Sequence, residues 1–202
     1  PILGDIQHNT KHILQAISEA KTAGCDVVVF AELAICGYCP DDLLLDAHFI
    51  DRVENALADI AKSSFGITVI VGTVRKNPQL AGKPLCNSAA ILCDGEVVGF
   101  QDKCLLPTYD VFDEWRYFEP AKSERVWVLG GKKIGITICE DIWKAFDPVL
   151  QGRYKEDPVE YFEDKNIDLL INISASPYSL GKINTRTLLA KKVAKRLKCP
   201  VA

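Results

Sequence analysis

Residues 133–143, with the sequence KIGITICEDIW, are the most informative stretch for the fold, because they combine the pattern of a buried strand with a reactive side chain at its end. The apolar, β-branched run before Cys139 is typical of a strand. Glu140 and Asp141 follow the cysteine at once. Neighbouring residues of a strand face opposite ways, so these carboxylates need not point at the sulfur. The stretch therefore predicts a strand whose carboxyl end presents a thiol.

The segments before this strand alternate between helix and strand patterns. The pattern predicts a helix over 9–24, a buried strand over 25–32, a second helix with Phe49, Val53, Leu57, Ile60 and Ala61 on its inner face, and a strand over 67–74. For the first helix we expect Asn9 or Thr10 as the cap and Gly24 as the stop. Helices that alternate with strands in this way are typical of an α/β fold.

Two hairpins and a further strand and helix follow. The expected elements are a hairpin over 87–103 that turns at Asp-Gly, a hairpin over 124–139 that turns at Gly-Gly, a short helix over 158–166, a strand over 167–174, and a last helix with Leu188, Leu189, Val193, Ala194 and Leu197 facing inward. Asp-Gly favours a tight turn because both residues accept positive φ angles.

The composition indicates one globular domain of ordinary type. The chain has 202 residues, of which 48% are hydrophobic and 25% charged, enough for one sizeable core. A net charge of -3 and a pI near 5.7 give no reason to expect a nucleic-acid or membrane partner. The apolar stretches are far shorter than the roughly 20 residues of a membrane-spanning helix.

The eight cysteines and the chain ends bear on the cellular setting. The cysteines lie in apolar or strand-like contexts without the framework of a secreted scaffold, so we expect reduced thiols and a cytoplasmic protein. The first residue is Pro1 and no Met occurs, which indicates a processed or excised piece. No signal peptide is visible in it.

Three chemically distinct side chains come at or just past the ends of predicted strands: Glu32, Lys103 and Cys139. Side chains at the carboxyl edges of strands converge in α/β folds, so these residues can meet. Such a set suits amide hydrolysis through a thioester. The glutamate takes the thiol proton, the lysine stabilises the oxyanion, and the cysteine attacks the carbonyl. From spacing alone, a cysteine of plain core packing remains an alternative.

Four separated motifs carry a resemblance to a known family. They are FAELAICGYCPDDLLL (30–45), DKCLLPTYDVFDEWRYFEP (102–120), GITICEDIW (135–143) and LLINISASPYSLGK (169–182). In order and separation they resemble the Glu-Lys-Cys motifs of the nitrilase, or carbon-nitrogen hydrolase, superfamily. They are most similar to the glutaminase domain of glutamine-dependent NAD synthetase.

The resemblance implies a fold and a set of catalytic residues. The fold would be an α-β-β-α sandwich, truncated at both ends, with residues 1–202 as one incomplete domain. Cys139 would be the nucleophile, Glu32 the general base, Lys103 the oxyanion stabiliser and Glu114 a supporting acid. The chain starts with PILGDIQHNT, which resembles the end of the family's first strand and its loop, and stops at CPVA inside what resembles a later strand.

The resemblance also implies a substrate and partners. Glutamine would be hydrolysed to glutamate and ammonia without metal or cofactor. A separate synthetase domain, which we expect outside these residues, would use the ammonia with ATP, Mg and deamido-NAD to make NAD. The implied glutamine-binding residues are Tyr109, Glu140, Ser174, Ser176 and Arg186. An arginine suits the substrate α-carboxylate and a carboxylate suits its α-amine. The family also forms multi-subunit assemblies, so we expect a homo-oligomer.

Other readings stay open at this point. The chain could be a carbon-nitrogen hydrolase for another amide, nitrile or carbamoyl substrate, or a non-catalytic assembly module of the same fold. Cys36 and Cys39 have C-x-x-C spacing and could form a zinc site with His8 and His12. The basic residues between 182 and 198 could bind RNA, although they alternate with apolar positions as on the solvated face of an amphipathic helix.

Overall fold

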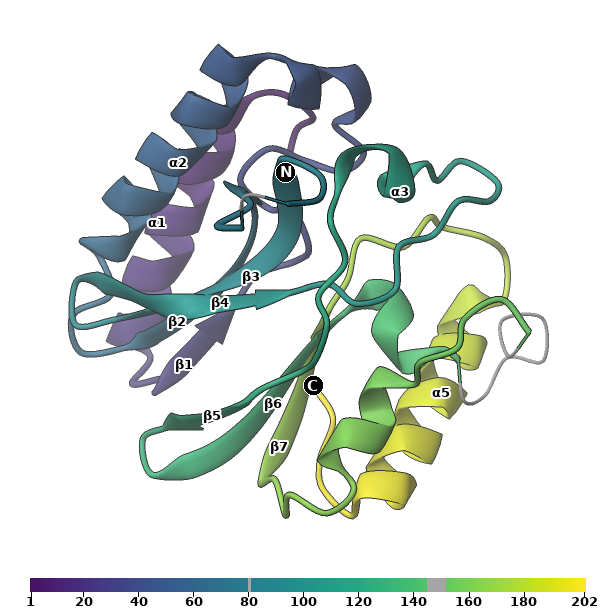
Figure 1. Ribbon diagram of the computed structural model, residues 1–202. Helices are drawn as coiled ribbons and strands as arrows, with labels where there is room; N and C mark the ends of the chain where they lie inside the picture. Colours follow the sequence, from purple (N-terminus) through teal and green to yellow (C-terminus); the bar gives the residue numbers. More distant parts are fainter. Residues whose placement is uncertain (80, 145–151) are drawn as a thin grey trace.

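The computed structural model describes residues 1–79, 81–144 and 152–202, and it has four layers (Figure 1). Helices α1 and α2 cover the outer face of one sheet, a second sheet faces the first, and α5 covers the outer face of the second. The helical segments are α1 (Ile6–Thr22), η1 (Asp41–Leu45), α2 (Ala47–Ala61), α3 (Glu114–Tyr117), η2 (Cys139–Ile142), η3 (Pro158–Phe162) and α5 (Lys182–Leu197), where η marks a 3₁₀ helix. The expected α-β-β-α sandwich is confirmed.

The described strands form one four-stranded and one three-stranded sheet. The first has the order β1-β2-β3-β4, with β1 (Val27–Val29), β2 (Thr68–Lys76), β3 (Leu85–Cys93) and β4 (Glu96–Asp102). The second has the order β5-β6-β7, with β5 (Val126–Leu129), β6 (Lys132–Ile138) and β7 (Leu169–Ile173). Strands β1 and β2 are parallel, as are β6 and β7, and the other pairs are antiparallel.

Both predicted hairpins are present, and their turns explain why. Asp94 and Gly95 join β3 to β4 with φ angles of 52° and 85°. Gly130 and Gly131 join β5 to β6 with φ angles of 55° and 76°. Two central residues with positive φ twist the chain in the sense that antiparallel strands require.

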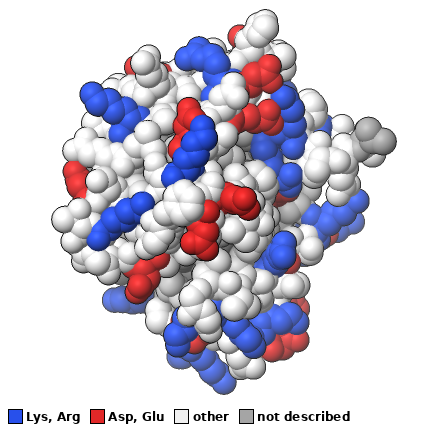
Figure 2. Space-filling model, turned by 90° about the vertical axis from the view of Figure 1, so that its left-hand side faces the viewer, with Lys and Arg blue, Asp and Glu red and all other residues white. Residues whose placement is uncertain are grey.

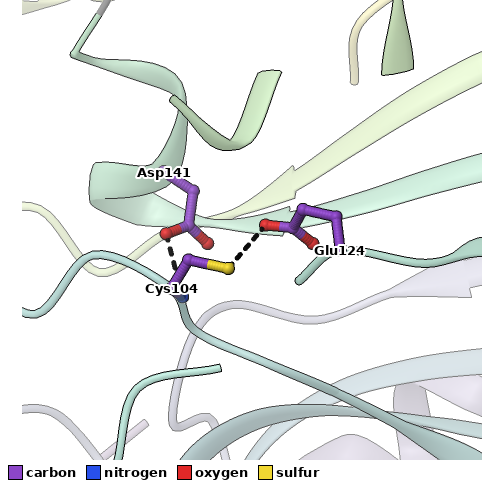
Figure 3. A group of neighbouring side chains, drawn as sticks. All are labelled: Cys104, Glu124 and Asp141. Carbon is purple, nitrogen blue, oxygen red and sulfur yellow. Dashed lines mark hydrogen bonds between the residues drawn. The ribbon is translucent and has the colours of Figure 1, made fainter. Parts of the chain in front are cut away.

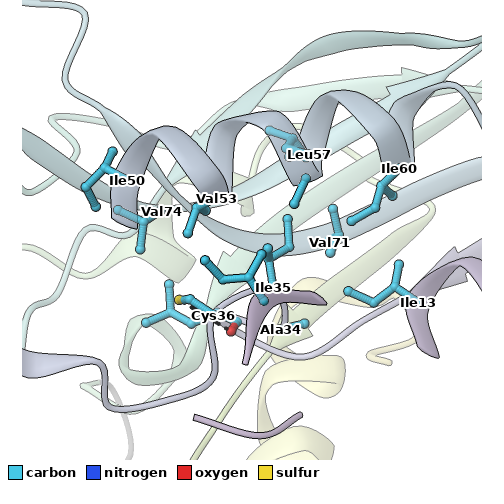
Figure 4. Packing of buried hydrophobic residues seen from close by; sticks show 14 of the residues in the cluster. Ile13, Ala34, Ile35, Cys36, Ile50, Val53, Leu57, Ile60, Val71 and Val74 are labelled. Carbon is cyan, nitrogen blue, oxygen red and sulfur yellow. Dashed lines mark hydrogen bonds between the residues drawn. The ribbon is translucent and has the colours of Figure 1, made fainter. Parts of the chain in front are cut away.

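Among the described residues, three clusters of buried apolar side chains hold the four layers together. The first packs α1 and α2 onto the outer face of the first sheet, and Figure 4 shows Val53 and Leu57 of α2 beside Val71 of β2. The second lies between the sheets and includes Ile91, Ile136 and Ile171. The third joins the second sheet to η3 and α5. The last helix buries Leu189, Val193 and Leu197 on its inner face.

Strand β1 differs from its prediction. The continuous apolar run predicts a fully buried strand, but Val27 and Val29 are 38% and 41% exposed. In the described part of the chain β1 pairs only with β2, at one edge of the sheet. Within the described residues β1 thus has no second neighbouring strand, and Val27 and Val29 are exposed along that edge.

The helix boundaries and one inward position also need correction. Asp5, not Asn9 or Thr10, caps α1 by accepting a hydrogen bond from the His8 N–H at 3.0 Å. Gly24, with a φ of 73°, follows the helix end as expected. Leu188 of α5 is 54% exposed rather than buried.

The surface and the helices bear on partners. Acidic and basic side chains are interspersed on the face that Figure 2 draws, with no field of a single sign. Most of the basic residues of α5 lie on its exposed face, as expected for a solvated amphipathic helix. Among the described residues, no helix combines the length and the apolar character needed to cross a bilayer.

Candidate active site

Glu32, Lys103 and Cys139 lie together in the interior. Glu32 follows β1 within a few residues, and the other two come directly after β4 and β6. Their exposed fractions are 1%, 1% and 7%. The Lys103 Nζ lies 2.7 Å from Glu32 Oε1, and the charges of both residues shift the pKa of Cys139. The strand ends thus converge although the residues are far apart in sequence.

Lys103 lies between two carboxylates. Its Nζ is 2.6 Å from Glu114 Oε1 in addition to the contact with Glu32, and all three side chains are buried. Burial opposes the charge of Lys103, but the Glu114 and Glu32 carboxylates outweigh it and raise the pKa of Lys103 well above its ordinary value. The ammonium is therefore charged at neutral pH.

Two residues that the sequence analysis missed hold these carboxylates. Asn87 on β3 donates from Nδ2 to Glu32 Oε1 at 2.9 Å and to Glu114 Oε2 at 3.2 Å. The Tyr38 hydroxyl donates to Glu114 Oε1 at 2.8 Å. A signal for Asn87 existed, since it is a polar residue within the apolar run LCNSAAILC of a central strand. Buried polar groups of this kind need partners.

Cys139 has a strained backbone and a protonated thiol. Its φ is 48°, a region that side chains with a Cβ seldom adopt and that clusters at functional sites. The Ser174 hydroxyl donates to its Sγ at 3.3 Å. Burial, reinforced by the Glu32 carboxylate and opposed by the Lys103 ammonium, raises the pKa of the thiol to about 12. In the free protein the cysteine thus needs a base to become a nucleophile.

The loop after β7 links Glu32 to Cys139. The Ala175 N–H donates to Glu32 Oε2 at 3.0 Å, and Ser174, its neighbour, contacts the cysteine sulfur. Glu32 also lies tightly against β2. A Cβ added to Gly72 would come within 2.6 Å of the Glu32 Cα, so only glycine allows this approach.

Glu140, the residue after Cys139, is the centre of a second cluster of polar side chains. It is buried, and it accepts hydrogen bonds from the Tyr109 hydroxyl at 2.8 and 2.9 Å and from the Tyr154 hydroxyl at 3.2 Å. The Arg153 guanidinium lies 4.1 Å from the centre of the Tyr109 ring. Burial raises the pKa of Glu140, although the two hydroxyls and nearby cations oppose this. Tyr154 and Arg153 carried no signal in the sequence.

The remaining predicted residues lie apart from these contacts. Ser176 is half-buried in the loop after β7. Arg186 is exposed on α5, where it lines a cavity of about 250 Å³ with Trp143 and Asn172. The residues that line this cavity include none of Glu32, Lys103 and Cys139.

The zinc alternative does not assemble. Cys36 is buried against the Leu33 carbonyl, while the Cys39 thiol contacts the Asp41 carboxylate at 3.0 Å. Contrary to expectation, His8 and His12 both lie in α1, where their tilted rings have centroids 4.3 Å apart. Within the described ranges, the one group of three or more metal-ligating side chains is Cys104, Glu124 and Asp141.

A family model and the sequence relatives point to the same protein family. The model of the family described as Carbon-nitrogen hydrolase matches residues 1–202. A glutamine-dependent NAD(+) synthetase from Synechocystis is 40% identical over 207 residues, which cover 100% of this chain and 37% of the relative. One from Thermotoga maritima is 37% identical and is matched over 90% of this chain and 30% of its own length. The chain thus spans about a third of these curated relatives.

Solved structures agree with the sequence relatives. The glutamine-dependent NAD+ synthetase from Acinetobacter baumannii in complex with ADP has a TM-score of 0.88 and 32% identity, over 100% of this chain and 35% of that one. An amidase from Nesterenkonia sp. shares the fold, with a TM-score of 0.77 and 20% identity. The match covers 99% of this chain and 70% of the amidase chain. The chain therefore belongs to the carbon-nitrogen hydrolase family.

Proposed function

We propose that this chain is the glutaminase part of a glutamine-dependent NAD synthetase, with Glu32, Lys103 and Cys139 as its catalytic triad. The observation that carries the proposal is the buried Lys103 ammonium between Glu32 and Glu114, within electrostatic reach of the cysteine. A charge kept so deep in the protein needs both partners to be stable there. The names of the relatives supply the substrate.

The geometry supports a thioester mechanism. Glu32 takes the thiol proton while the Cys139 sulfur attacks the carboxamide carbon of glutamine. The Lys103 ammonium stabilises the negative oxygen of the tetrahedral intermediate. Glu32 then gives its proton to the leaving nitrogen, and ammonia departs from the thioester. Water, deprotonated by Glu32, attacks the thioester, and the thiol takes the proton back as glutamate leaves.

Substrate recognition in this proposal uses Glu140 and the tyrosine hydroxyl that is hydrogen-bonded to it. Glu140 binds the glutamine α-amine, and Tyr109 keeps the carboxylate oriented through its two short contacts. Ser174, beside the sulfur, and Ser176 contact the substrate from the loop after β7. Arg186 binds the α-carboxylate, which requires its exposed side chain to reach from α5 toward the cysteine.

The partner of the proposed reaction is a synthetase domain. ATP, Mg and deamido-NAD would bind there, and the hydrolytic step itself uses no metal or cofactor. The relatives are about three times as long as the matched segment, which leaves room for such a domain. All eight cysteines are free thiols, which fits a reducing compartment, so we place the enzyme in the cytoplasm. The family resemblance alone is the ground for expecting a homo-oligomer.

Ammonia release by the full-length protein tests the substrate. We expect release from glutamine and none above background from aliphatic amides or nitriles, measured with a coupled ammonia assay. Turnover of simple amides at a similar rate would favour another carbon-nitrogen hydrolase. A glutamine-like chloroketone should label Cys139 alone among the eight cysteines, as seen by peptide mass spectrometry. Uniform labelling would favour a non-catalytic assembly module.

Glu140→Gln should weaken glutamine binding. The change keeps the shape but removes the charge that pairs with the α-amine, and charge-assisted hydrogen bonds contribute about 1.5–3 kcal/mol. We expect KM for glutamine to rise about 10- to 100-fold, with a smaller change in kcat. Glu19→Gln on the outer face of α1 is the control and should leave both constants unchanged. An unchanged KM in the first variant would remove Glu140 from the binding site.

A further inference from the structure

The carboxylate of Asp141 joins two segments of the chain that no strand pairing connects. It is fully buried. Its Oδ1 accepts hydrogen bonds from the backbone N–H groups of Cys104 at 3.1 Å and Leu105 at 2.8 Å, and its Oδ2 accepts one from Ile138 at 2.9 Å. Figure 3 shows Asp141 directed at the Cys104 backbone. The first two donors follow the buried lysine, and the third precedes the nucleophilic cysteine.

The need for such a link follows from the sheet arrangement. Lys103 comes at the end of β4 in the first sheet, and Cys139 at the end of β6 in the second. The two sheets meet mainly through apolar side chains, which fix distances less sharply than hydrogen bonds do. The hydrogen bond from the Ala175 N–H to Glu32 Oε2 holds the partner of Lys103 but not the lysine's own backbone segment. The ammonium and the sulfur would therefore shift relative to each other if the sheets moved.

We infer that Asp141 is a positioning residue that sets the separation between the Lys103 ammonium and the Cys139 sulfur. The inference rests on the proposed amide hydrolysis. It does not require Asp141 to touch the substrate. Its three hydrogen bonds hold both catalytic segments through their backbones, whatever the side chains of Cys104, Leu105 and Ile138 are.

A neighbouring carboxyl indicates which of two acids carries the charge. Glu124 is buried, its Oε1 contacts the Cys104 Sγ at 3.3 Å, and its Oε2 has no hydrogen-bond partner. The ligand atoms of Cys104, Glu124 and Asp141 lie within 4.8 Å of one another. Two adjacent buried carboxyls do not readily ionise together. Because Asp141 has three backbone donors and Glu124 has only a thiol, Asp141 is the ionised member.

Burial raises the pKa of both carboxyls, but only for Asp141 do backbone hydrogen bonds oppose the shift. Burial raises the pKa of Asp141 to about 7, although its backbone hydrogen bonds and Lys103 oppose the shift. Burial and the Asp141 charge raise the pKa of Glu124 well above its ordinary value. A neutral Glu124 can be replaced by its amide with little change, whereas an ionised Asp141 cannot.

Two isosteric variants of the full-length protein test the inference. In Asp141→Asn the amide oxygen can still accept, but the amide NH₂ faces a backbone N–H that also donates. Misplacement of catalytic groups by about 1 Å costs about 100-fold in rate, so we expect kcat for glutamine to fall about 100-fold with KM changed less than about threefold. Glu124→Gln should keep kcat within about threefold of the wild type.

A third variant separates positioning from stability. Asn9 is buried like Asp141 and bonds to three backbone groups, the Ile2 N–H, the Ile2 carbonyl and the Ile35 carbonyl. Asn9→Ala should therefore lower Tm but keep kcat per folded protein. Positioning requires that Asp141→Asn lose far more kcat than Asn9→Ala at a similar Tm. If kcat followed Tm in both variants, Asp141 would have only a structural role.

An alkylation measurement is independent of the substrate. The rate at which iodoacetamide modifies Cys139 at pH 7, followed by mass spectrometry, depends on the base and the ammonium beside the sulfur. We expect it to fall in Asp141→Asn and to stay unchanged in Glu124→Gln, even if glutamine were the wrong substrate. Equal losses of alkylation rate in both variants would overturn the inference. If elemental analysis also found a stoichiometric metal in the wild type, Cys104, Glu124 and Asp141 would form a metal site instead.

Discussion

Cys139→Ala is expected to abolish ammonia release from glutamine by the full-length protein, by at least about 10⁴-fold in kcat, because the change removes the sulfur on which the proposed thioester forms. Synthesis of NAD with ammonia as the nitrogen source should continue, since it requires only the proposed synthetase domain. Both reactions can be measured on the same preparation, with ammonia and NAD as the products followed.

Two further cysteine variants sharpen this result. Cys139→Ser should also fail, because an alkoxide is far harder to form than a thiolate beside the same base. Cys25→Ala, which removes an exposed thiol, is the matched control and should behave as the wild type. Glutamine turnover that survived Cys139→Ala would show that the nucleophile lies elsewhere.

Lys103→Met should remove both activity and stability. The change leaves the Glu32 and Glu114 carboxyls buried and facing each other without a cation. Removing one partner of a buried ion pair costs about 3–5 kcal/mol in the free energy of unfolding. Loss of the proposed oxyanion partner should lower kcat by about 100-fold or more. Urea unfolding and the ammonia assay measure the two effects separately.

The pH dependence of Lys103→Met has a definite sign. Burial raises the pKa of Glu114, and Lys103 lowers it in the wild type. Without the lysine, the folded-state pKa rises further above the unfolded value. A carboxyl of this kind stabilises the fold below its unfolded pKa, and that contribution is lost as the pH increases. We expect the variant's stability deficit to grow between pH 5 and pH 8.

A double variant provides the control for Lys103→Met. Adding Glu114→Gln removes one of the two unpaired carboxyls, so the free energy of unfolding should recover in part while kcat stays at the level of the single variant. If the double variant regained activity, the lysine would serve the structure alone and the proposed oxyanion role would be wrong.

Local signals were sufficient for much of this protein. The turn residues at 94–95 and 130–131 predict both hairpins because their positive φ angles are properties of the residues themselves. The apolar stripe of α2 predicts its buried face for the same reason, since helical periodicity repeats within a few residues. The positions of Glu32, Lys103 and Cys139 at or just past predicted strand ends were also sufficient to predict that the three residues meet.

Tertiary structure alone decided the rest, because these features depend on contacts between distant segments. Nothing near Asp141 in sequence shows that its carboxylate reaches the backbone after Lys103, past the end of β4 in the first sheet. Asn87 and Tyr38 likewise meet Glu114 only after the chain has folded. A sequence can specify which side chains a strand end presents, but the hydrogen bonds that orient them arise when separate layers pack.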